Sequence, residues 1–368
     1  MKVSRVATVA GLLASALAIA TIHSLLPAAG SPAPAAGSST STDRPLRDLA
    51  GRQVLIGTAV DYAAFTSDAT YSARVASEFS SITAENVMKW EVVEPVRGQL
   101  DFTAADALLA AARKNGQQMR GHTLVWHNQL PAWLTQGVDS GTIDATELRS
   151  ILRKHITDEV RHFRGHIYQW DVVNEAIDDN GQLRDTLWLR ELGPSYIADA
   201  FRWAHQADPK AKLFLNDYNV EGISAKSDAY LALVKDLLAQ KVPVQGFAAQ
   251  GHYGVQFGFH AASDIATNFG RFEALGLETA ITEADVRMIM PPDNPKLQAQ
   301  AQGYSTLLQG CLLAKRCNSF TVWGYTDKYS WVPGFFDGEG AANLLDENFA
   351  AKPGYRELQA ILVLAGRH

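Results

Sequence analysis

The sequence predicts an α/β fold built as a single-domain (β/α)8 TIM barrel, and three observations support this prediction. Short apolar, β-branched runs alternate with longer amphipathic stretches along the 368-residue chain, which is the pattern of a parallel sheet. Eight such units in about 300 residues fit a closed barrel. The chain is 47% hydrophobic and 20% charged, a composition that excludes a disordered protein.

Each predicted strand is a short run enriched in apolar and β-branched residues. The eight runs are Val54–Val60, Ser81–Thr83, Gln118–Leu124, Tyr168–Val173, Lys212–Leu215, Gly246–Ala249, Thr279–Thr282 and Ser319–Val322. An open, doubly wound sheet is the structural alternative. Such a sheet usually carries a glycine-rich phosphate turn after its first strand, and the Gly57–Val60 segment does not form one.

Four of the amphipathic stretches between these strands predict helices with definable ends. They span Ala104–Asn115, Glu147–Arg164, Tyr196–Ala207 and Asp228–Gln240. In the first of them, Leu108, Leu109 and Ala112 share one face, and Asn115-Gly116 is a helix-stop signal. Strand and helix therefore alternate, as the barrel requires.

The first 30 residues indicate a secretory signal peptide. Lys2 and Arg5 give a positive start, and residues 6–22 contain no charge. An uncleaved membrane anchor is the alternative, but the Pro, Gly and Ser residues that follow suit a cleavage region. We expect residues 31–45 to be a flexible leader and residues 46–368 to be the barrel. The mature protein is then secreted, extracellular or periplasmic, with no membrane contact.

Charge and cysteine content restrict the partners and the redox state. The formal net charge is −6 and no basic run is present, which argues against a nucleic-acid partner. Cys311 and Cys317 are the two cysteines, and an exported chain meets an oxidising compartment where they could pair. Two free buried thiols are the alternative, because spacing alone does not show that their Cα atoms approach within about 7 Å.

Polar and aromatic residues follow seven of the eight predicted strands. These strand-end segments are Ala84–Trp90, His122–Gln129, Asn174-Glu175, Asn216–Asn219, Gln250–His252, Glu283–Asp285 and Trp323-Gly324. In a barrel these ends meet at one mouth, which is where active sites lie. One polar residue past a strand is an ordinary loop residue, whereas seven such segments at one mouth predict a functional site.

The residue types at these ends indicate a carbohydrate ligand. They are carboxylates, amides, imidazoles and indoles, with no thiol nucleophile and no phosphate loop. Amides and carboxylates hydrogen-bond to sugar hydroxyls, and indole faces stack on the apolar faces of pyranose rings. The carboxylates among them include Glu175 and Glu283, which follow two different strands.

Four motifs resemble those of the family-10 glycoside hydrolases. They are Thr83–Trp90, Gly121–His127, Trp170–Ala176 and Ile281–Glu283, and the likeness extends from about Leu55 to Leu358. That family consists chiefly of retaining endo-β-1,4-xylanases on a (β/α)8 barrel. The resemblance therefore implies an enzyme that hydrolyses internal bonds of xylan and xylo-oligosaccharides. We expect it to be a monomer with no cofactor and no metal.

The resemblance also assigns roles to individual positions. Glu175 matches the family's general acid/base, and Glu283 matches its nucleophile. Positions matching the substrate cleft are Glu85, Asn86, Lys89, His122, Trp126, Gln129, Asn174, Tyr218, Gln250, His252, Trp323 and Trp331. Cys311 and Cys317 resemble a disulfide of many relatives. The His252–His260 loop is less typical, and we expect it to affect how distal sugars bind.

Several of these residues admit a second interpretation. His122, His127 and His252 could hold a metal, but no helical His pair is present, so we expect hydrogen bonds to hydroxyls or to Glu283 instead. Trp126, Trp323 and Trp331 could be core residues, although the last two follow strand 8 in a polar loop. We also hypothesise that His252 and Asp285 keep Glu283 ionised and oriented.

Two other functions compete with the xylanase. An enzyme preferring β-1,4-glucan differs in one hydroxymethyl group on each sugar, which a pocket discriminates by only about 10–200-fold. A catalytically silent carbohydrate-binding protein could use the same barrel, but both glutamates are present. Comparing aryl xylobioside with aryl cellobioside separates the first alternative, and turnover that Glu283→Ala abolishes excludes the second.

Overall fold

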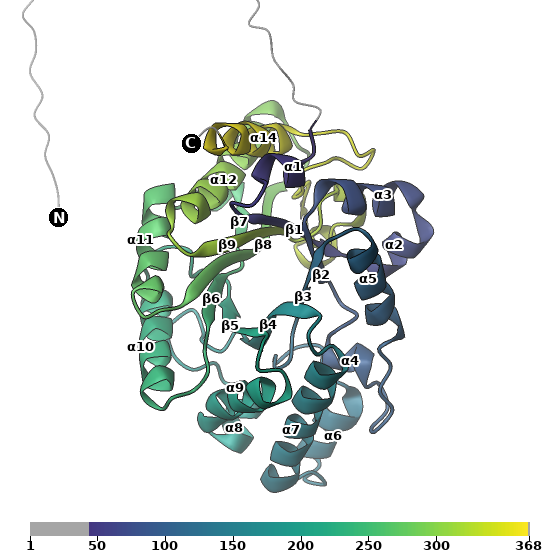
Figure 1. The fold of residues 1–368 in the computed structure, drawn as a ribbon, viewed down its shortest axis with the longest axis vertical. Coiled ribbons are helices and arrows are strands. Elements are labelled where there is room, and N and C mark those ends of the chain that lie inside the picture. The colour runs from purple at the N-terminus through teal and green to yellow at the C-terminus, as the bar shows by residue number, and fades with distance from the viewer. Residues whose placement is uncertain (1–43, 367–368) are drawn as a thin grey trace, which may run out of the picture. The chain divides into compact units, whose positions relative to one another are not determined.

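Eight parallel strands close into a barrel in the computed structural model, which describes residues 44–366. The pairing runs β1-β2-β3-β4-β5-β6-β8-β9, and β9 pairs with β1 to complete the ring. The strands lie in the centre and the helices surround them (Figure 1). The predicted (β/α)8 barrel is therefore confirmed, and the open sheet is wrong.

All eight predicted strands are present. The barrel strands are β1 (Leu55–Val60), β2 (Ser81–Ala84), β3 (Gln118–Gly121), β4 (Ile167–Asn174), β5 (Lys212–Asp217), β6 (Gly246–Ala249), β8 (Glu278–Ile289) and β9 (Cys317–Val322). Two short strands outside the ring, β7 (His252–Gly254) and β10 (Glu339–Gly340), both pair with β8.

Helices connect these strands. They are α1 (Leu46–Ala50), α2 (Tyr62–Ser67), α3 (Ala69–Glu78), α4 (Trp90–Val93), α5 (Thr103–Lys114), α6 (Ala132–Asp139), α7 (Ala145–His162), α8 (Leu187–Leu192), α9 (Ser195–Ala207), α10 (Ala225–Ala239), α11 (Ala262–Glu273), α12 (Asn294–Leu313), α13 (Val332–Phe335) and α14 (Pro353–Ala365). Two 3-10 turns, η1 (Val255–Phe257) and η2 (Asp327–Tyr329), lie in loops. The four predicted helices correspond to α5, α7, α9 and α10.

Side-chain caps explain where several of these helices begin. Asp144 accepts the backbone N–H of Glu147 at the start of α7, and Asp293 does the same for Lys296 at α12. Ser224 opens α10 with a reciprocal capping pair to Ser227. Each cap satisfies a backbone donor that has no partner within its helix. The local sequence thus sets the start of the helices between barrel strands.

The main hydrophobic core fills the space between the strands and the surrounding helices. A small separate cluster, Phe214, Ala248 and Ala280, comes from three neighbouring strands, β5, β6 and β8. Elsewhere in the barrel, Arg120 is fully buried and bonds to Asp171 and Gln169. The barrel therefore contains a buried ion pair between β3 and β4, and His122 also contacts its Asp171 carboxylate.

Strand β3 is shorter than the sequence predicts. It ends at Gly121 rather than Leu124, because the ladder to β4 is interrupted at His122 and Thr123. Hydrogen bonding to β4 resumes at Leu124, whose N–H donates to the Asp171 carbonyl oxygen at 3.0 Å. The interruption releases His122 from the strand, so its imidazole reaches Asp171.

Strand β8 is longer than the predicted Thr279–Thr282 run. Its outer half continues to Ile289, because Asp285, Val286 and Arg287 align with β7 and Met288-Ile289 pairs with β10. These partners come from distant loops, so no local pattern indicates them. The extension carries Asp285 and Arg287 to the barrel mouth.

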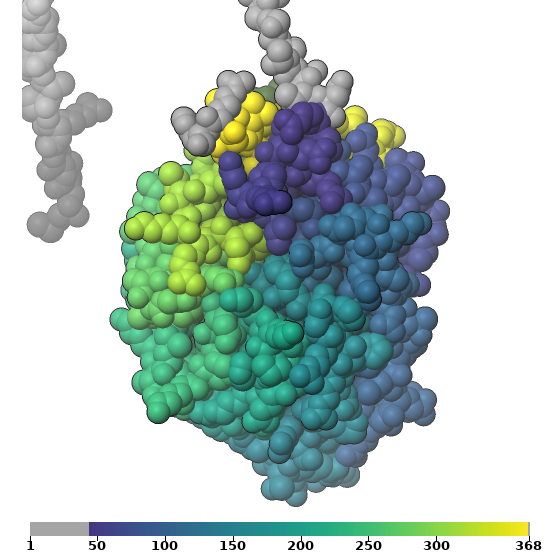
Figure 2. Space-filling model, in the orientation of Figure 1, coloured from purple at the N-terminus to yellow at the C-terminus, as the bar shows by residue number. Residues whose placement is uncertain are grey.

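The two ends of the described chain meet on one side of the barrel. Residues of α1 and α14 lie side by side in the space-filling view (Figure 2). Gln359 Nε2 donates to the Arg44 carbonyl oxygen at 2.9 Å, and Gln53 Nε2 to that of Ala365 at 3.1 Å. Arg44 and Pro45, at the end of the predicted leader, are thus held to the barrel.

The signal-peptide prediction for residues 1–30 and most of the leader prediction lie outside the described residues. Within the described part, no helix has the length and apolar character needed to cross a membrane. Cys311 and Cys317 form a disulfide with a Cα–Cα distance of 5.2 Å, so the predicted pairing is confirmed and the free-thiol alternative is wrong. The bridge joins the end of α12 to the start of β9.

Candidate active site

A cleft of about 860 Å³ opens at the carboxyl ends of the barrel strands. All fourteen residues predicted as catalytic or substrate-binding line it. They are Glu85, Asn86, Lys89, His122, Trp126, Gln129, Asn174, Glu175, Tyr218, Gln250, His252, Glu283, Trp323 and Trp331. They come from segments that follow seven different strands, so the barrel alone brings them together.

Glu283 lies within β8 and is almost completely buried. Its Oε1 accepts a hydrogen bond from Asn216 Nδ2 at 2.7 Å, and its Oε2 lies 3.3 Å from His252 Nε2. Burial favours the neutral carboxyl, but His122, His252 and Arg120 outweigh it and lower the pKa to about 2. Glu283 is therefore a carboxylate at neutral pH.

His252 connects Glu283 to Asp285. Its Nδ1 lies 3.0 Å from Asp285 Oδ2, and that oxygen also accepts the Trp331 indole N–H at 2.8 Å. Burial disfavours the imidazolium, yet Asp285 and Glu283 outweigh this effect and raise the pKa of His252 to about 10. The geometry agrees with the hypothesis that His252 and Asp285 keep Glu283 ionised.

Glu175 follows β4 directly and lines the same cleft. Its Oε1 accepts hydrogen bonds from Asn174 Nδ2 and Gln250 Nε2, each at 3.2 Å. Its Oε2 lies 4.0 Å from His127 Nε2. Glu283 Oε1 and Oε2 lie 3.9 Å from His122 Nδ1 and 3.3 Å from His252 Nε2, so the two glutamates occupy different electrostatic settings.

Three carboxamides link the two glutamates. Asn216 Nδ2 donates to both Glu283 Oε1 and Asn174 Oδ1, and its own Oδ1 accepts from Thr282 Oγ1 at 2.6 Å. Gln250 Nε2 donates to Asn174 Oδ1 and to Glu175 Oε1. These bonds fix the orientation of each amide and hold both carboxyls in one network.

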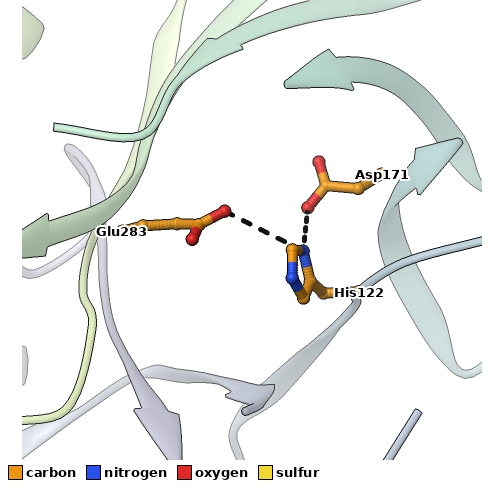
Figure 3. A group of neighbouring side chains, drawn as sticks. All are labelled: His122, Asp171 and Glu283. Atoms are coloured by element: carbon orange, nitrogen blue, oxygen red, sulfur yellow. Dashed lines mark hydrogen bonds and ion pairs between the residues drawn. The ribbon is translucent and has the colours of Figure 1, made fainter. Parts of the chain in front are cut away.

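His122, Asp171 and Glu283 are the one group within residues 44–366 whose ligand atoms could surround a metal ion, since these atoms lie within 4.8 Å of one another. His122 Nδ1 lies 2.8 Å from Asp171 Oδ2 and 3.9 Å from Glu283 Oε1 (Figure 3). Both Asp171 oxygens bond to the Arg120 guanidinium. The Arg120 guanidinium already neutralises the Asp171 carboxylate. The three residues therefore do not fit a metal cation as a second positive charge in the same place.

Lys89 organises one end of the cleft. Its Nζ donates to Asn86 Oδ1 at 3.0 Å and to Gln129 Oε1 at 2.7 Å, and it lies 5.0 Å from the Trp126 ring centroid. Burial lowers the pKa of Lys89, although nearby glutamates act in the opposite direction. Burial and the negative charge of Asp61 raise the pKa of Glu85 to about 7. This end presents both donors and acceptors.

Tyr218 lies at the part of the cleft formed after β5. Its hydroxyl accepts from Arg184 Nη2 at 2.9 Å, and Lys226 Nζ lies 3.5 Å from its ring centroid. Lys226 pairs with Asp217 at 2.8 Å, and burial raises the pKa of Asp217 to about 7 despite this charge. The cation–π contact and the hydrogen bond fix the Tyr218 side chain in the cleft.

Aromatic rings form the wall of the cleft after β9. Trp323 lies edge-on to His122, and Trp331 packs edge-on to His252 at 5.2 Å between ring centroids. Phe335 and Phe336 pack on Trp331 and extend this wall, and Phe335 is 71% exposed. Trp126, Trp323 and Trp331 all line the cleft, and Trp323 is at the same time a buried residue at 6% exposure.

A second cavity of about 550 Å³ adjoins the cleft and shares Asn219, His252 and Arg287 with it. The predicted atypical loop, His252–His260, forms most of its lining. Gly222 makes room for His260, since a Cβ there would lie within 3.0 Å of the imidazole. The loop is thus packed into the fold beside the cleft.

Sequence reasoning missed several residues of this site. Asn216 was recognised only as a strand-end residue, and its position directly after the β5 apolar run was the signal. Arg184 and Arg287 line the cleft as well, but neither follows a strand directly. Arg184 lies in the loop before α8, and Arg287 depends on the extension of β8, so only the folded chain brings them to the site.

Comparisons with known proteins agree with the geometry. Residues 45–361 match the family model described as Glycosyl hydrolase family 10. The chain is 45% identical over 302 residues to an endo-1,4-beta-xylanase of Agaricus bisporus, covering 82% of this chain and 88% of that protein. It is 40% identical over 326 residues to endo-1,4-beta-xylanase B of Thermotoga neapolitana, covering 88% and 92% respectively.

Solved structures resemble the barrel closely. Xylanase 10B from Thermotoga petrophila RKU-1 in complex with xylobiose superposes with a TM-score of 0.82 at 39% identity, covering 86% of this chain and 97% of that one. Native xylanase 10B from Thermotoga maritima gives 0.83 at 39% identity, covering 88% and 100%. The likeness therefore includes both the whole barrel and its sequence.

Proposed function

The chain belongs to glycosyl hydrolase family 10, and we propose that it is a retaining endo-1,4-β-xylanase in which Glu283 is the nucleophile and Glu175 the acid/base. One observation supports these roles above all. Glu283 and Glu175 line one cleft, and histidine and arginine charges lower the pKa of Glu283 to about 2. An anionic carboxylate beside a second carboxyl is the pair that glycoside hydrolysis needs.

The first chemical step forms a covalent intermediate. A Glu283 oxygen attacks the anomeric carbon, and the bond from that carbon to the leaving oxygen breaks as Glu175 delivers its proton to that oxygen. Asn216 and His252 hold the Glu283 carboxylate in place through its two oxygens. Asn174, between the two glutamates, is positioned to bond the sugar 2-hydroxyl, a contact that strengthens in the transition state.

The second step releases the product. Glu175, now a carboxylate, takes a proton from water as the water oxygen attacks the anomeric carbon and the ester to Glu283 breaks. Two inversions at one carbon give net retention. Gln250 and Asn174 donate to Glu175 Oε1 and keep that carboxyl facing the cleft in both steps.

The ends of the cleft are proposed to bind sugars on either side of the reacting bond. Glu85, Asn86, Lys89 and Gln129 supply hydrogen bonds on the non-reducing side, and the tryptophans provide stacking faces. Tyr218, on the other side, faces the leaving group. Xylan and xylo-oligosaccharides are therefore the proposed substrates, and retained activity after exhaustive chelation is the expected result for a metal-free reaction.

We further propose that the protein is exported through residues 1–30, that residues 31–45 lead into one catalytic barrel, and that it acts as a monomer without nucleic-acid partners. The acidic net charge of −6 and the disulfide support this proposal. Determining the N-terminus and the mass of the mature protein from culture fluid tests it. An intact N-terminus on a cell-bound protein would contradict the export proposal.

Proton NMR of the enzyme acting on a linear xylo-oligosaccharide tests the function. The expected first product is the β-anomer, which retention requires. An early α-anomer would show an inverting enzyme and overturn the nucleophile role of Glu283. Cleavage of aryl cellobioside in strong preference to aryl xylobioside would instead identify a β-1,4-glucanase, and no turnover on either would leave a binding protein.

A further inference from the structure

The segment that follows β4 carries Glu175 in an unusual backbone conformation. Glu175 has a φ of 57°, the left-handed region that non-glycine residues seldom adopt. Such a conformation persists only where surrounding contacts over-determine it. Contacts from other residues must therefore hold the Glu175–Ile177 backbone in place.

Arg184 contacts three consecutive carbonyl oxygens of this segment. Its Nε donates to the Glu175 oxygen at 2.8 Å, and its Nη2 to the Ile177 oxygen at 3.0 Å. Its backbone N–H donates to the Ala176 oxygen at 2.8 Å. No other side chain in the described residues bonds to more than one of these three carbonyls.

The same guanidinium also reaches the leaving-group side of the cleft. Arg184 Nη2 donates to the Tyr218 hydroxyl at 2.9 Å, and its Cζ lies 5.5 Å from the Tyr218 ring centroid. Arg184 is half-buried and lines the cleft between Glu175 and Tyr218. One planar side chain thus joins the segment that carries Glu175 to the residue expected to face the departing sugar.

We infer that Arg184 is a positioning residue for the acid/base step, holding the Glu175 carboxyl in line with the leaving oxygen through its three carbonyl contacts. It acts through Glu175 and not on the sugar. The inference rests on the proposed acid/base role of Glu175. A planar guanidinium suits this task, because it offers several donors in a fixed fork, whereas a lysine ammonium is a point charge on a flexible stem.

This role predicts a dependence on the leaving group. A xylo-oligosaccharide needs protonation of its leaving oxygen, so displacement of Glu175 slows bond cleavage. A 2,4-dinitrophenolate leaves without protonation, so cleavage of 2,4-dinitrophenyl β-xylobioside does not need a well-placed acid. A residue that only stabilises the fold would affect both substrates alike. A residue that only binds the departing sugar through Tyr218 would also spare the aryl glycoside, but it would leave kcat on the aryl glycoside unchanged and give no rescue by azide.

The test compares kcat/KM on xylopentaose and on 2,4-dinitrophenyl β-xylobioside for wild type and Arg184→Lys. We expect a loss of roughly 10–100-fold on xylopentaose and a change below about threefold on the aryl glycoside. With the aryl glycoside, kcat should fall because the second step needs Glu175 as a base. Azide, a nucleophile that needs no base, should restore that kcat.

The ratio of the two substrates is measured on one preparation, so a reduced folded fraction cancels. Arg184→Gln, whose amide reaches a single carbonyl, should show the same signature more strongly. Arg190→Lys is the matched control, since Arg190 belongs to nearby α8, forms its one ion pair within residues 44–366 with exposed Asp185, and does not line the cleft. It should leave both values unchanged.

Glu175→Ala distinguishes a failure of the acid/base role of Glu175 from a failure of the positioning role of Arg184. If it does not spare the aryl glycoside, the proposed acid/base role fails, and the inference about Arg184 fails with it. If Glu175→Ala shows the signature while Arg184→Lys slows both substrates equally, slows neither, or raises only KM, Arg184 is not a positioning residue. Failure of both Arg184 variants to fold would assign it a structural role and equally overturn the inference.

Discussion

Burial and charge act in opposite directions at Glu283. Burial favours the neutral form of this carboxyl, but the interactions with His122, His252 and Arg120 outweigh it and lower its pKa to about 2. Asp171 balances this cluster, because it bonds to both Arg120 and His122. The nucleophile is therefore kept ionised by groups from two segments, β3 with the residue after it and the segment that follows β6.

Replacing His252 by alanine should move the acid limb of the pH profile. Glu283 must be ionised to attack, and His252 contributes both a hydrogen bond and a charge to that state. The acid limb of kcat/KM should therefore lie well below the ordinary carboxyl value of 4.5 in wild type and shift to higher pH in His252→Ala. Initial rates on aryl xylobioside between pH 3 and 7 measure it, and an unmoved limb would contradict the role.

The same histidine makes stability depend on pH. Its pKa is raised to about 10 from an ordinary 6.5, so the stability from its charge is complete below 6.5 and is lost as the pH rises through 10. Wild type should therefore have a higher free energy of unfolding than His252→Ala. This difference should be largest near pH 6 and smaller near pH 10. Urea unfolding at both values tests this, and an excess that grows with pH would contradict it.

At the scale of elements, the outer part of β8 supports the nucleophile that the inner part carries. Strand pairs of the barrel ring reach Ala284, one residue past Glu283, whereas Asp285, Val286 and Arg287 pair with β7. This added pairing sets His252 opposite Asp285 in register. The outer part of β8 and the three-residue strand β7 thus position Asp285 and His252, which support the nucleophile Glu283.

Glycine at position 121 allows β3 to pack against β4. A Cβ there would collide with the Trp170 ring, which is fully buried. Gly121→Ala should therefore lower the free energy of unfolding by about 1–3 kcal/mol, measured by urea denaturation. It should also reduce activity, because His122 is the next residue.

Gly270→Ala is the control for this change. Gly270 lies within α11, and a Cβ there would meet no atom within 4 Å. The substitution should be neutral or stabilising by up to about 1 kcal/mol, since alanine favours helix. Equal losses in both variants would mean that the Trp170 contact is not the cause.

The disulfide should stabilise the junction of α12 and β9. Cys311 and Cys317 are six positions apart, and closing so short a loop is worth roughly 2 kcal/mol. Cys311→Ala combined with Cys317→Ala should lower the urea midpoint accordingly, while kcat stays close to wild type because the bridge lies away from the cleft. Treatment of wild type with reductant should give a similar shift, and an unchanged midpoint would contradict the expectation.

At the scale of the whole molecule, the acidic surface has no part in substrate capture. The net charge is −6, but a neutral xylan chain is neither attracted nor repelled by it. The kcat/KM for a linear xylo-oligosaccharide should thus change less than about twofold between low salt and about 0.5 M NaCl. Thermal unfolding in the same buffers controls for stability, and a tenfold fall would indicate a charged substrate.

Local sequence determined the barrel strands and most of the cleft. Apolar runs of Val, Ile and Ala predict where the strands lie. The composition and periodicity of such a run can be read from a few consecutive residues, without knowledge of the folded chain. In a parallel barrel every strand end faces one mouth, so Glu175, Glu283 and their cleft partners could be placed from position alone. The resemblance to a known family added the roles that position could not assign.

Only the tertiary structure decided how these groups act on one another. The charge state of Glu283 depends on Arg120, His122 and His252. Arg120 and His122 lie more than a hundred positions before Glu283 in the chain, and His252 lies 31 positions before it. In the fold, His122 Nδ1 and His252 Nε2 lie 3.9 Å and 3.3 Å from the Glu283 carboxylate oxygens. Arg184 reached the site through a loop that no periodicity marks. Hydrogen bonds and charges act through space and not along the chain, so the sequence determined which residues meet at the mouth, and the folded chain determined their ionisation and orientation.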